Sequence, residues 1–237
     1  NVPVQRLLDM SVNNNFSEDY FDPNSDCFNE EIALGWRLPG DRSIKETSLE
    51  EFTNSITGPE VQRFVGAAKY KSANTDVLTR IISKISEKTP AQHIEEIADA
   101  IGYEGAFYIS LSPEGYPAFS GGGCLSARDL ARFGLIFTRE GKNIAGQPFA
   151  NEEFLSKSLS RPAPSLSEPK DWLRYSNHVM TDGRFVGHAG YGGQFLLVDT
   201  QTKTSISFLS VLENEDGYDD VYMGNVAATL KNLMQAF

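Results

Sequence analysis

A tyrosine between two lysines, Tyr70, stands directly before the clearest amphipathic stretch of the chain, in KYKSANTDVLTRIISKIS. Apolar residues at helical spacing follow it and predict a helix: Val77, Leu78, Ile81, Ile82 and Ile85. Ser72 or Asn74 would cap this helix. A phenol has a pKa of about 10 and becomes a useful base only where nearby positive charge lowers that value. Tyr70 is therefore either a loop tyrosine at the surface or a proton-transfer residue that the helix holds in place.

The pattern Tyr-x-Ser or Tyr-x-Asn is weak by itself, because it occurs three times, starting at Tyr70, Tyr108 and Tyr175. Only the first copy runs at once into a strong helix. A second candidate is the segment GHAGYGGQFLLVD, which contains His188. Its glycines allow close backbone approach, and an exposed N–H there could form half of an oxyanion hole. From the residues alone, the segment is more typical of a glycine-rich hairpin turn with a surface histidine, although both interpretations stay open.

The histidines, the cysteines and the net charge mainly exclude other kinds of site and partner. The three histidines have no metal-ligand spacing, so we expect no metal site, and no pattern predicts a cofactor. Cys27 and Cys124 stand too far apart for a disulfide scaffold and are expected to be free thiols. The net charge of −11 argues against nucleic acid and anionic membranes as partners.

The elements that must position these residues change in type along the chain. Residues 1–160 are predicted to be mainly helical, with helices at 2–10 and 48–56 and further starts at Pro90, Ser126 and Asn151. Residues 161–237 predict about four antiparallel strands, including a hairpin around Asp182-Gly183, and then a final helix that should lie on the sheet. This order is typical of an α+β fold.

Four segments, VPVQRLLDM, KYKSANTDVL, GGGCLSARDLARFG and GHAGYGGQFLLVD, occur in the order and style of the serine β-lactamase and penicillin-binding-protein superfamily. The chain most resembles the class C-like branch, which includes family VIII carboxylesterases, D-aminopeptidases and nylon-oligomer hydrolases. FSEDYFDPNSD and YKSANTDVL are most similar to the 6-aminohexanoate-dimer hydrolase group. The resemblance covers nearly the whole chain and implies a β-lactamase/transpeptidase-like fold, with an antiparallel sheet flanked by helices plus a helical region.

The resemblance also implies roles for particular residues. Tyr70 and Ser72 match the family's Tyr-x-Asn or Tyr-x-Ser motif, which implies Tyr70 as catalytic acid and base and Ser72 as a substrate contact. His188-Ala189-Gly190 match the Lys-Thr-Gly motif, so His188 and Gly190 would contact substrate. The backbone N–H of Tyr191 would then enter the oxyanion hole. Tyr20 resembles the loop tyrosine that donates a hydrogen bond to the scissile amide in the nylon-oligomer hydrolase group.

Two departures from the family pattern shape the expected activity. A histidine in the place of the motif's lysine is mostly neutral near pH 7, which suits a neutral ester or amide better than a carboxylate-bearing β-lactam. The family's first motif, Ser-x-x-Lys, should lie upstream of residue 2. The match at Ser167-Glu-Pro-Lys170 is out of order and lies among prolines, where no helix is expected.

We therefore expect a serine hydrolase of an ester or amide bond that acts through an acyl-enzyme. Its N-terminal strands and nucleophile helix would lie outside this chain, which by itself would be inactive. The apolar strand TSISFLSVL would then be an open edge, which favours self-association or a missing segment supplied in trans. The alternative is a non-catalytic protein of the same fold that binds a peptide or a partner chain. The sequence does not indicate the compartment.

Overall fold

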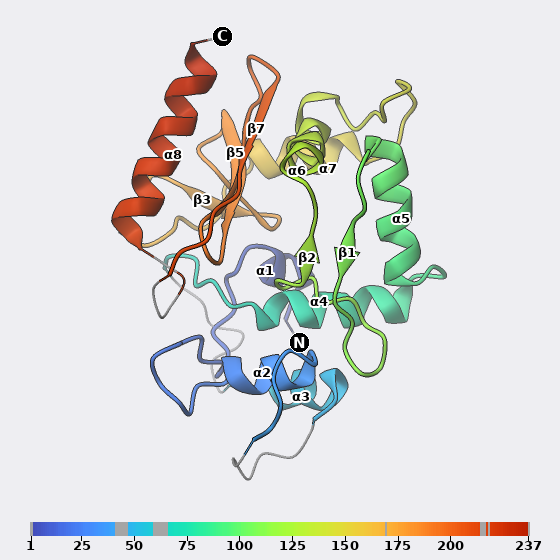
Figure 1. Ribbon diagram of the computed structural model, residues 1–237, viewed down its shortest axis with the longest axis vertical. Helices are drawn as coiled ribbons and strands as arrows, with labels where there is room; N and C mark the ends of the chain where they lie inside the picture. Colours follow the sequence, from blue (N-terminus) through green and yellow to red (C-terminus); the bar gives the residue numbers. More distant parts are fainter. Residues whose placement is uncertain are drawn as a thin grey trace. The chain divides into compact units, whose positions relative to one another are not determined.

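Figure 1 shows the computed structural model of the chain, which describes residues 2–40, 47–58, 66–168, 170–213, 217 and 219–236. The chain divides into two compact units. Unit 1 consists of Asn1–Glu95 and Tyr108–Cys124, and unit 2 consists of Glu96–Phe107 and Leu125–Phe237. The boundary at residue 160 follows the change from helices to strands in the sequence, and it stays a prediction.

Unit 1 is mainly helical. Its elements are α1 (Val4–Leu8), α2 (Cys27–Ala33), α3 (Leu49–Ser55), α4 (Ala73–Ile85), the first half of α5 (Pro90–Ile101), and the short strands β1 (Tyr108–Ile109) and β2 (Gly123–Cys124). The helices predicted near residues 2–10, 48–56, before Ile85 and from Pro90 are confirmed. The sequence pattern, rich in Asn, Asp and Ser, predicted a loop through residue 31, but α2 begins at Cys27, because Cys27, Ile32 and Ala33 are buried among apolar side chains.

Helix α4 contributes to two apolar clusters formed by described residues of unit 1. The first cluster is formed by Phe16, Cys27, Ala33, Leu34, Leu49, Phe52, Ala73 and Ala118. The second contains Leu7, Val12 and Leu78. Burial of these side chains supplies the main driving force for fixing α4, at roughly 25 cal/mol per Å² of apolar surface removed from water. The packed helix in turn fixes the backbone that leads into it, including Tyr70.

Unit 2 is built on a five-stranded antiparallel sheet in chain order. Its strands are β3 (Arg174–Ser176), β4 (Val179–Thr181), β5 (Phe185–Gly190), β6 (Gln194–Asp199) and β7 (Thr204–Phe208). The hairpin around Asp182-Gly183 is confirmed, and it joins β4 to β5. The extra strand, β3, arises from a two-residue turn in which Asn177 and His178 both have positive φ angles, 50° and 64°. Such a turn matches the twist of paired strands, but its second position normally carries glycine and here carries His178, so the sequence did not predict it.

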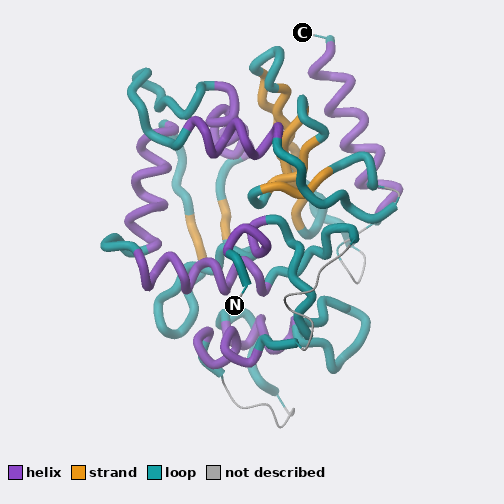
Figure 2. Tube along the Cα trace, turned by 180° about the vertical axis from the view of Figure 1, so that it is seen from behind, coloured by secondary structure: helices purple, strands orange, loops and turns teal. Residues whose placement is uncertain are grey.

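Helices cover both faces of this sheet (Figure 1), and Figure 2 shows the strands between the same helices from behind. One face packs Val186, Leu196 and Val198 against side chains of α6 (Ala127–Gly134), the following 3₁₀ turn η1 (Leu135–Thr138) and α7 (Glu152–Ser160). The other face packs Phe195 against α8 (Asp220–Gln235), which confirms the final helix on the sheet. Among the described helices, none has the length and hydropathy needed to cross a membrane.

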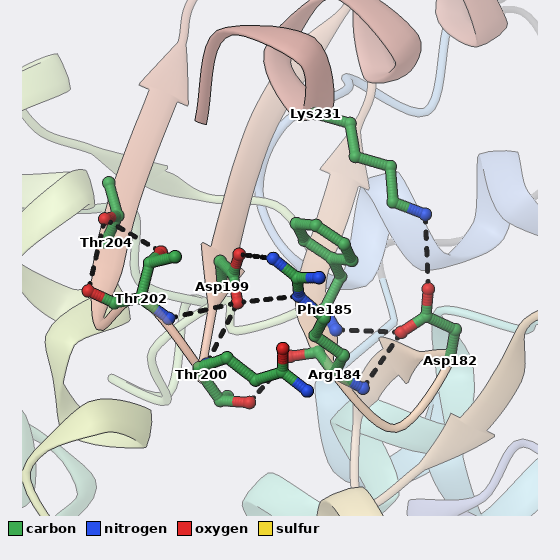
Figure 3. A network of polar contacts seen from close by, with 9 residues as sticks. Asp182, Arg184, Phe185, Asp199, Thr200, Thr202, Thr204 and Lys231 are labelled. Atoms are coloured by element: carbon green, nitrogen blue, oxygen red, sulfur yellow. Dashed lines mark hydrogen bonds and ion pairs between the residues drawn. The ribbon is translucent and has the colours of Figure 1, made fainter. Parts of the chain in front are cut away.

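A network of charged groups fixes the sheet where β5 begins and β6 ends (Figure 3). Arg184 donates from Nε and Nη2 to the two carboxylate oxygens of Asp199, at 3.1 and 2.5 Å. Asp182 accepts the backbone N–H groups of Arg184 and Phe185 and the Nζ of Lys231 from α8. The hydrogen bonds from Arg184 lower the pKa of Asp199 to about 2. This end of the sheet is therefore held by paired charges as well as by apolar packing.

Candidate functional site

The segment that carries Tyr70 is tied to the loop after α1 by its neighbouring lysine. Nζ of Lys71 donates to the carbonyl oxygens of Asn14 and Phe16, at 2.6 and 2.8 Å, and to Oδ1 of Asn14 at 2.8 Å. These acceptors use all three donors of an ammonium group. Burial lowers the pKa of Lys71, and the charge of Lys69 lowers it further. Lys71 thus acts as a structural anchor, while Tyr70 is 37% exposed on the approach to α4.

Ser72 occupies the N-cap position of α4, but its hydroxyl makes no capping hydrogen bond. Its Oγ instead donates to Oε2 of Glu30 at 2.6 Å, and its backbone N–H donates to Oε2 of Glu18 at 2.9 Å. The other oxygen of Glu18 accepts the hydroxyl of Tyr20 at 3.3 Å. Glu18 therefore connects Tyr20 with Ser72, two residues that the sequence proposed for one site.

Glu18 and Glu30 are the residues of this cluster that sequence reasoning missed. Burial raises the pKa of Glu18, and it raises the pKa of Glu30 well above the usual range with help from Asp76. Both acids lie in a stretch rich in Asp, Glu and Asn, which is typical of a solvated loop. In such a stretch nothing in the pattern distinguishes a buried carboxyl from an exposed one.

In unit 2, the hydrogen bonds of His188 define its tautomer. Nδ1 lies 2.7 Å from the carbonyl oxygen of Ala189, and a carbonyl oxygen only accepts, so Nδ1 carries the proton. Burial lowers the pKa of His188, which keeps the ring neutral and makes Nε2 an acceptor. The hydroxyl of Tyr175, 3.0 Å from Nε2, is therefore the donor of that hydrogen bond.

Tyr175 is fully buried and lies edge-on to two histidine rings, those of His178 and His188. Burial, and secondarily the proximity of His188, lower the pKa of His178 to about 4. Sequence reasoning set Tyr175 aside as a chance copy of Tyr-x-Asn, because no helix follows it. Because the β3–β4 turn follows almost directly, Tyr175 lies in a strand of the sheet rather than before a helix. From this strand its hydroxyl reaches His188.

Gly190 ends β5, and the turn that follows it carries Tyr191, which is 54% exposed. Gly192 and Gly193 have φ angles of 75° and 84°, in the region that favours glycine. The N–H of Gly192 donates to the carbonyl of Gly217. The Ser210 hydroxyl lies 3.1 and 2.7 Å from the carbonyl oxygens of Gly192 and Gly193, to which it donates. The turn therefore has a fixed shape, and the oxyanion role of the Tyr191 N–H stays a prediction.

The structure groups the candidate residues by unit: Tyr20, Tyr70 and Ser72 lie in unit 1, and His188, Gly190 and Tyr191 lie in unit 2. Their catalytic and binding roles stay predictions. Ser167 lies outside the described helices and strands, and Lys170 pairs instead with Asp220 at 2.7 Å, which disfavours a nucleophile there. Cys27 and Cys124 are free thiols. Within the described ranges, no cluster of three histidine, cysteine or acidic side chains could hold a metal ion.

The comparisons with known proteins agree with the fold. A 6-aminohexanoate-dimer hydrolase of Paenarthrobacter ureafaciens is 26% identical over 229 residues, which cover 90% of this chain and 55% of the relative. The structure of a putative 6-aminohexanoate-dimer hydrolase from Bacillus anthracis has a TM-score of 0.78 at 17% identity and matches 98% of this chain and 60% of that one. The chain thus spans little more than half the length of these relatives. A family model described as Beta-lactamase matches residues 2–230, and the chain belongs to the β-lactamase family.

Proposed function

We propose that this chain carries the proton-transfer and oxyanion parts of a serine hydrolase that cleaves a neutral ester or amide through an acyl-enzyme. The observation that carries the proposal is the family match over residues 2–230, together with the 26% identity to a 6-aminohexanoate-dimer hydrolase. The nucleophilic serine would come from a Ser-x-x-Lys segment outside the 237 residues. The chain covers only 55% of that relative, which is consistent with this arrangement.

In the proposed reaction the serine Oγ attacks the carbonyl carbon while its proton passes to the pair formed by Tyr70 and the lysine of the Ser-x-x-Lys segment. The Tyr191 N–H stabilises the negative charge on the carbonyl oxygen. Tyr70 then protonates the leaving alcohol or amine, and an acyl-serine ester remains. Water attacks this ester in the second half-reaction, releases the acid and restores the serine.

The environment of His188 supports a neutral substrate. Nδ1 of His188 donates to Ala189, and Nε2 accepts from Tyr175, so the ring is neutral with both nitrogens occupied. A neutral ring offers no ionic attraction to a substrate carboxylate of the kind that β-lactams carry. Ester and amide substrates without a charge at that position avoid this disadvantage.

The first experiment compares the 237-residue chain with a longer product of the parent gene that includes the Ser-x-x-Lys segment. With p-nitrophenyl butyrate and nitrocefin, we expect the short chain to be inactive, because loss of a nucleophile costs a factor of about a million in serine hydrolases. The longer protein should hydrolyse the ester and react with a fluorophosphonate probe. Saturable hydrolysis by the repurified short chain would overturn the assignment of the nucleophile. A longer protein that neither hydrolyses nor reacts would favour a binding role.

The second experiment tests Tyr70 in the longer protein. Tyr70→Phe should lower kcat by roughly two to four orders of magnitude, the usual contribution of general acid–base catalysis. Folding should change little, because the substitution removes only a hydroxyl. Tyr108→Phe, which changes an exposed tyrosine in the same unit, is the matched control. If Tyr70→Phe keeps more than about a third of the wild-type kcat at an unchanged Tm, Tyr70 has no role in proton transfer.

A further inference from the structure

Two buried acids in unit 1 face each other beside the Tyr70 segment. Glu30 on α2 is 4% exposed, and Asp76 on α4 is 0% exposed. Their carboxyl groups lie within hydrogen-bonding reach of each other. Three of their four oxygens, Oε1 of Glu30 and both Oδ atoms of Asp76, are sealed from solvent and form no hydrogen bond of acceptable geometry. The Ser120 hydroxyl lowers the pKa of Asp76, but its Oγ is also buried without a hydrogen-bond partner.

Two ionised carboxylates in this position would be costly, because burial and like charge both disfavour the second negative charge. The groups that act on the two acids are the hydroxyls of Ser72 and Ser120 and a third acid, Glu18. The nearby cations face elsewhere. Lys71 donates to Asn14 and Phe16, as described above.

Arg80, one turn beyond Asp76 on α4, directs its guanidinium toward α3. Its terminal nitrogens donate to Glu50, Thr53 and Asn54. Arg80 therefore does not neutralise the acidic pair. A proton held between two carboxyl oxygens supplies the donor that the geometry lacks and removes one of the two negative charges.

We propose that Glu30 and Asp76 share a single proton in the folded protein, and that the protonated pair positions Ser72 at the entrance of α4. The link is direct, because Oε2 of Glu30 accepts the Ser72 hydroxyl at 2.6 Å. Ser72 is the third residue of the Tyr70-Lys71-Ser72 segment. The shared proton does not depend on the proposed function, whereas its consequence for catalysis rests on that function.

The shared proton makes the stability of the folded protein depend on pH, and the sign of this dependence follows from the pKa of Glu30. Burial, followed by the charge of Asp76, raises the pKa of Glu30 well above the value of 4.5 that a free glutamate has. The folded chain therefore retains a proton that the unfolded chain releases above about pH 4.5. The resulting stabilisation is complete below that pH and is lost as the pH rises through the folded-state pKa.

Infrared spectroscopy tests the proton directly on the 237-residue chain. At neutral pH the wild type should show the C=O stretching band of a buried, protonated carboxylic acid. Glu30→Gln and Asp76→Asn should each lose this band, because the remaining acid can ionise beside a neutral amide. Glu87→Gln makes the same chemical change at an exposed position after α4 and should keep the band. Absence of the band from the folded wild type would overturn the proposal.

A thermal-unfolding series separates a shared proton from a bound cation. From mildly acidic to mildly alkaline pH, the Tm of wild type and Glu87→Gln should fall in parallel, whereas the Tm of Glu30→Gln should fall less. Equal slopes for Glu30→Gln and wild type would contradict the shared proton. Addition of magnesium or calcium chloride should leave the wild-type Tm where it is. A Tm rise with either salt that Asp76→Asn abolishes would show that the pair holds a cation instead.

The positioning role is tested in the longer protein. The wild-type kcat should fall, at unchanged KM, as the pH rises through the pKa of the pair. Glu30→Gln should lose this decline, because its amide oxygen still accepts the Ser72 hydroxyl without a charge, and Glu87→Gln should retain it. Identical profiles for Glu30→Gln and wild type would remove the pair from positioning. An infrared band without hydrolysis by any protein would retain the shared proton and reject the proposed function.

Discussion

The hydroxyl of Tyr175 donates a hydrogen bond to Nε2 of His188 at 3.0 Å, while the Nδ1–H of the same ring donates to the carbonyl oxygen of Ala189. Both nitrogens of this histidine are thus occupied within the protein. The ring contributes shape and neutrality at the end of β5, rather than a mobile proton. A lysine at the same position would bring a full positive charge, which under the proposed function would favour a negatively charged substrate.

Tyr175→Phe should raise the pKa of His188. The lost hydrogen bond stabilised the neutral ring, and a bond worth about 1 kcal/mol corresponds to a change of just under one pKa unit. NMR titration of the His188 ring protons measures the shift. Tyr108→Phe removes a hydroxyl from an exposed tyrosine and should leave the titration unchanged. An unaltered His188 pKa in Tyr175→Phe would refute the assigned tautomer.

His178→Asn should reduce the sensitivity of unit 2 to mild acid. The pKa of His178 falls from 6.5 to about 4 on folding, so its contribution to stability is complete above pH 6.5 and is lost as the pH falls toward 4. A shift of this size corresponds to on the order of 3 kcal/mol. Asparagine tolerates the positive φ of this turn residue. Urea unfolding at several pH values measures the effect, and parallel pH profiles for variant and wild type would contradict it.

Two glycines of unit 2 should respond in opposite directions to alanine. A Cβ at Gly187 would lie 2.0 Å from the backbone oxygen of Leu196 in the neighbouring strand, so Gly187→Ala should destabilise the protein by about 1–3 kcal/mol or more. A Cβ at Gly224 in α8 would meet nothing within 4 Å, so Gly224→Ala should stabilise it by about 0.5–1 kcal/mol. Chemical denaturation of both variants measures the contrast, and destabilisation by Gly224→Ala would count against the packing described for α8.

Asp199→Asn should lower the Tm at neutral pH, because it removes the charge that Arg184 binds with two hydrogen bonds. The Asp199 pKa is about 2 in the folded protein, against 3.8 without its partners. Its contribution is therefore present above about pH 4 and is lost as the pH falls through 2. The Tm difference between variant and wild type should shrink in that window. Asp171→Asn, at an exposed position of the same unit, is the control and should change the Tm little at neutral pH.

Tyr20→Phe should impair amide hydrolysis more than ester hydrolysis in the longer protein. An amide nitrogen leaves less readily than an alkoxide, so a hydrogen bond to the scissile amide has more effect. In the structure the Tyr20 hydroxyl donates its single proton to Glu18, which also binds the backbone of Ser72, so Tyr20 must exchange this hydrogen bond for one to the substrate. Matched p-nitroanilide and p-nitrophenyl ester substrates measure the ratio. Equal losses on both would exclude Tyr20 from contact with the scissile bond.

The sequence predicted the elements with strong periodicity and missed those that depend on distant contacts. The spacing of Val77, Leu78 and Ile81 predicted α4, because apolar residues recur on one face of a helix at that spacing. Helix α2 was missed, because its buried residues Cys27 and Ile32 stand among polar residues that are typical of a loop. Strand β3 was missed, because its turn has no glycine.

The candidate site shows the same division. Tyr70, Ser72 and His188 were named from short motifs, which are local in sequence. Glu18 and Glu30, the partners of Ser72, were not named, and Tyr175, the partner of His188, was set aside, since these partners lie between 13 and 54 residues away along the chain. Whether an acid is buried beside another acid is decided by tertiary packing, and no local pattern records it.

Strand β5 is anchored differently at its two ends, and this has a consequence for how the protein can evolve. Paired charges of Asp182, Arg184 and Asp199 hold one end, while the other runs into the glycine-rich turn after Gly190, which backbone hydrogen bonds shape. Substitutions around this turn can reshape the region beside His188 while the ionic end keeps the sheet intact. Under the proposed function, this would assign adaptation to new substrates and preservation of the scaffold to opposite ends of one strand.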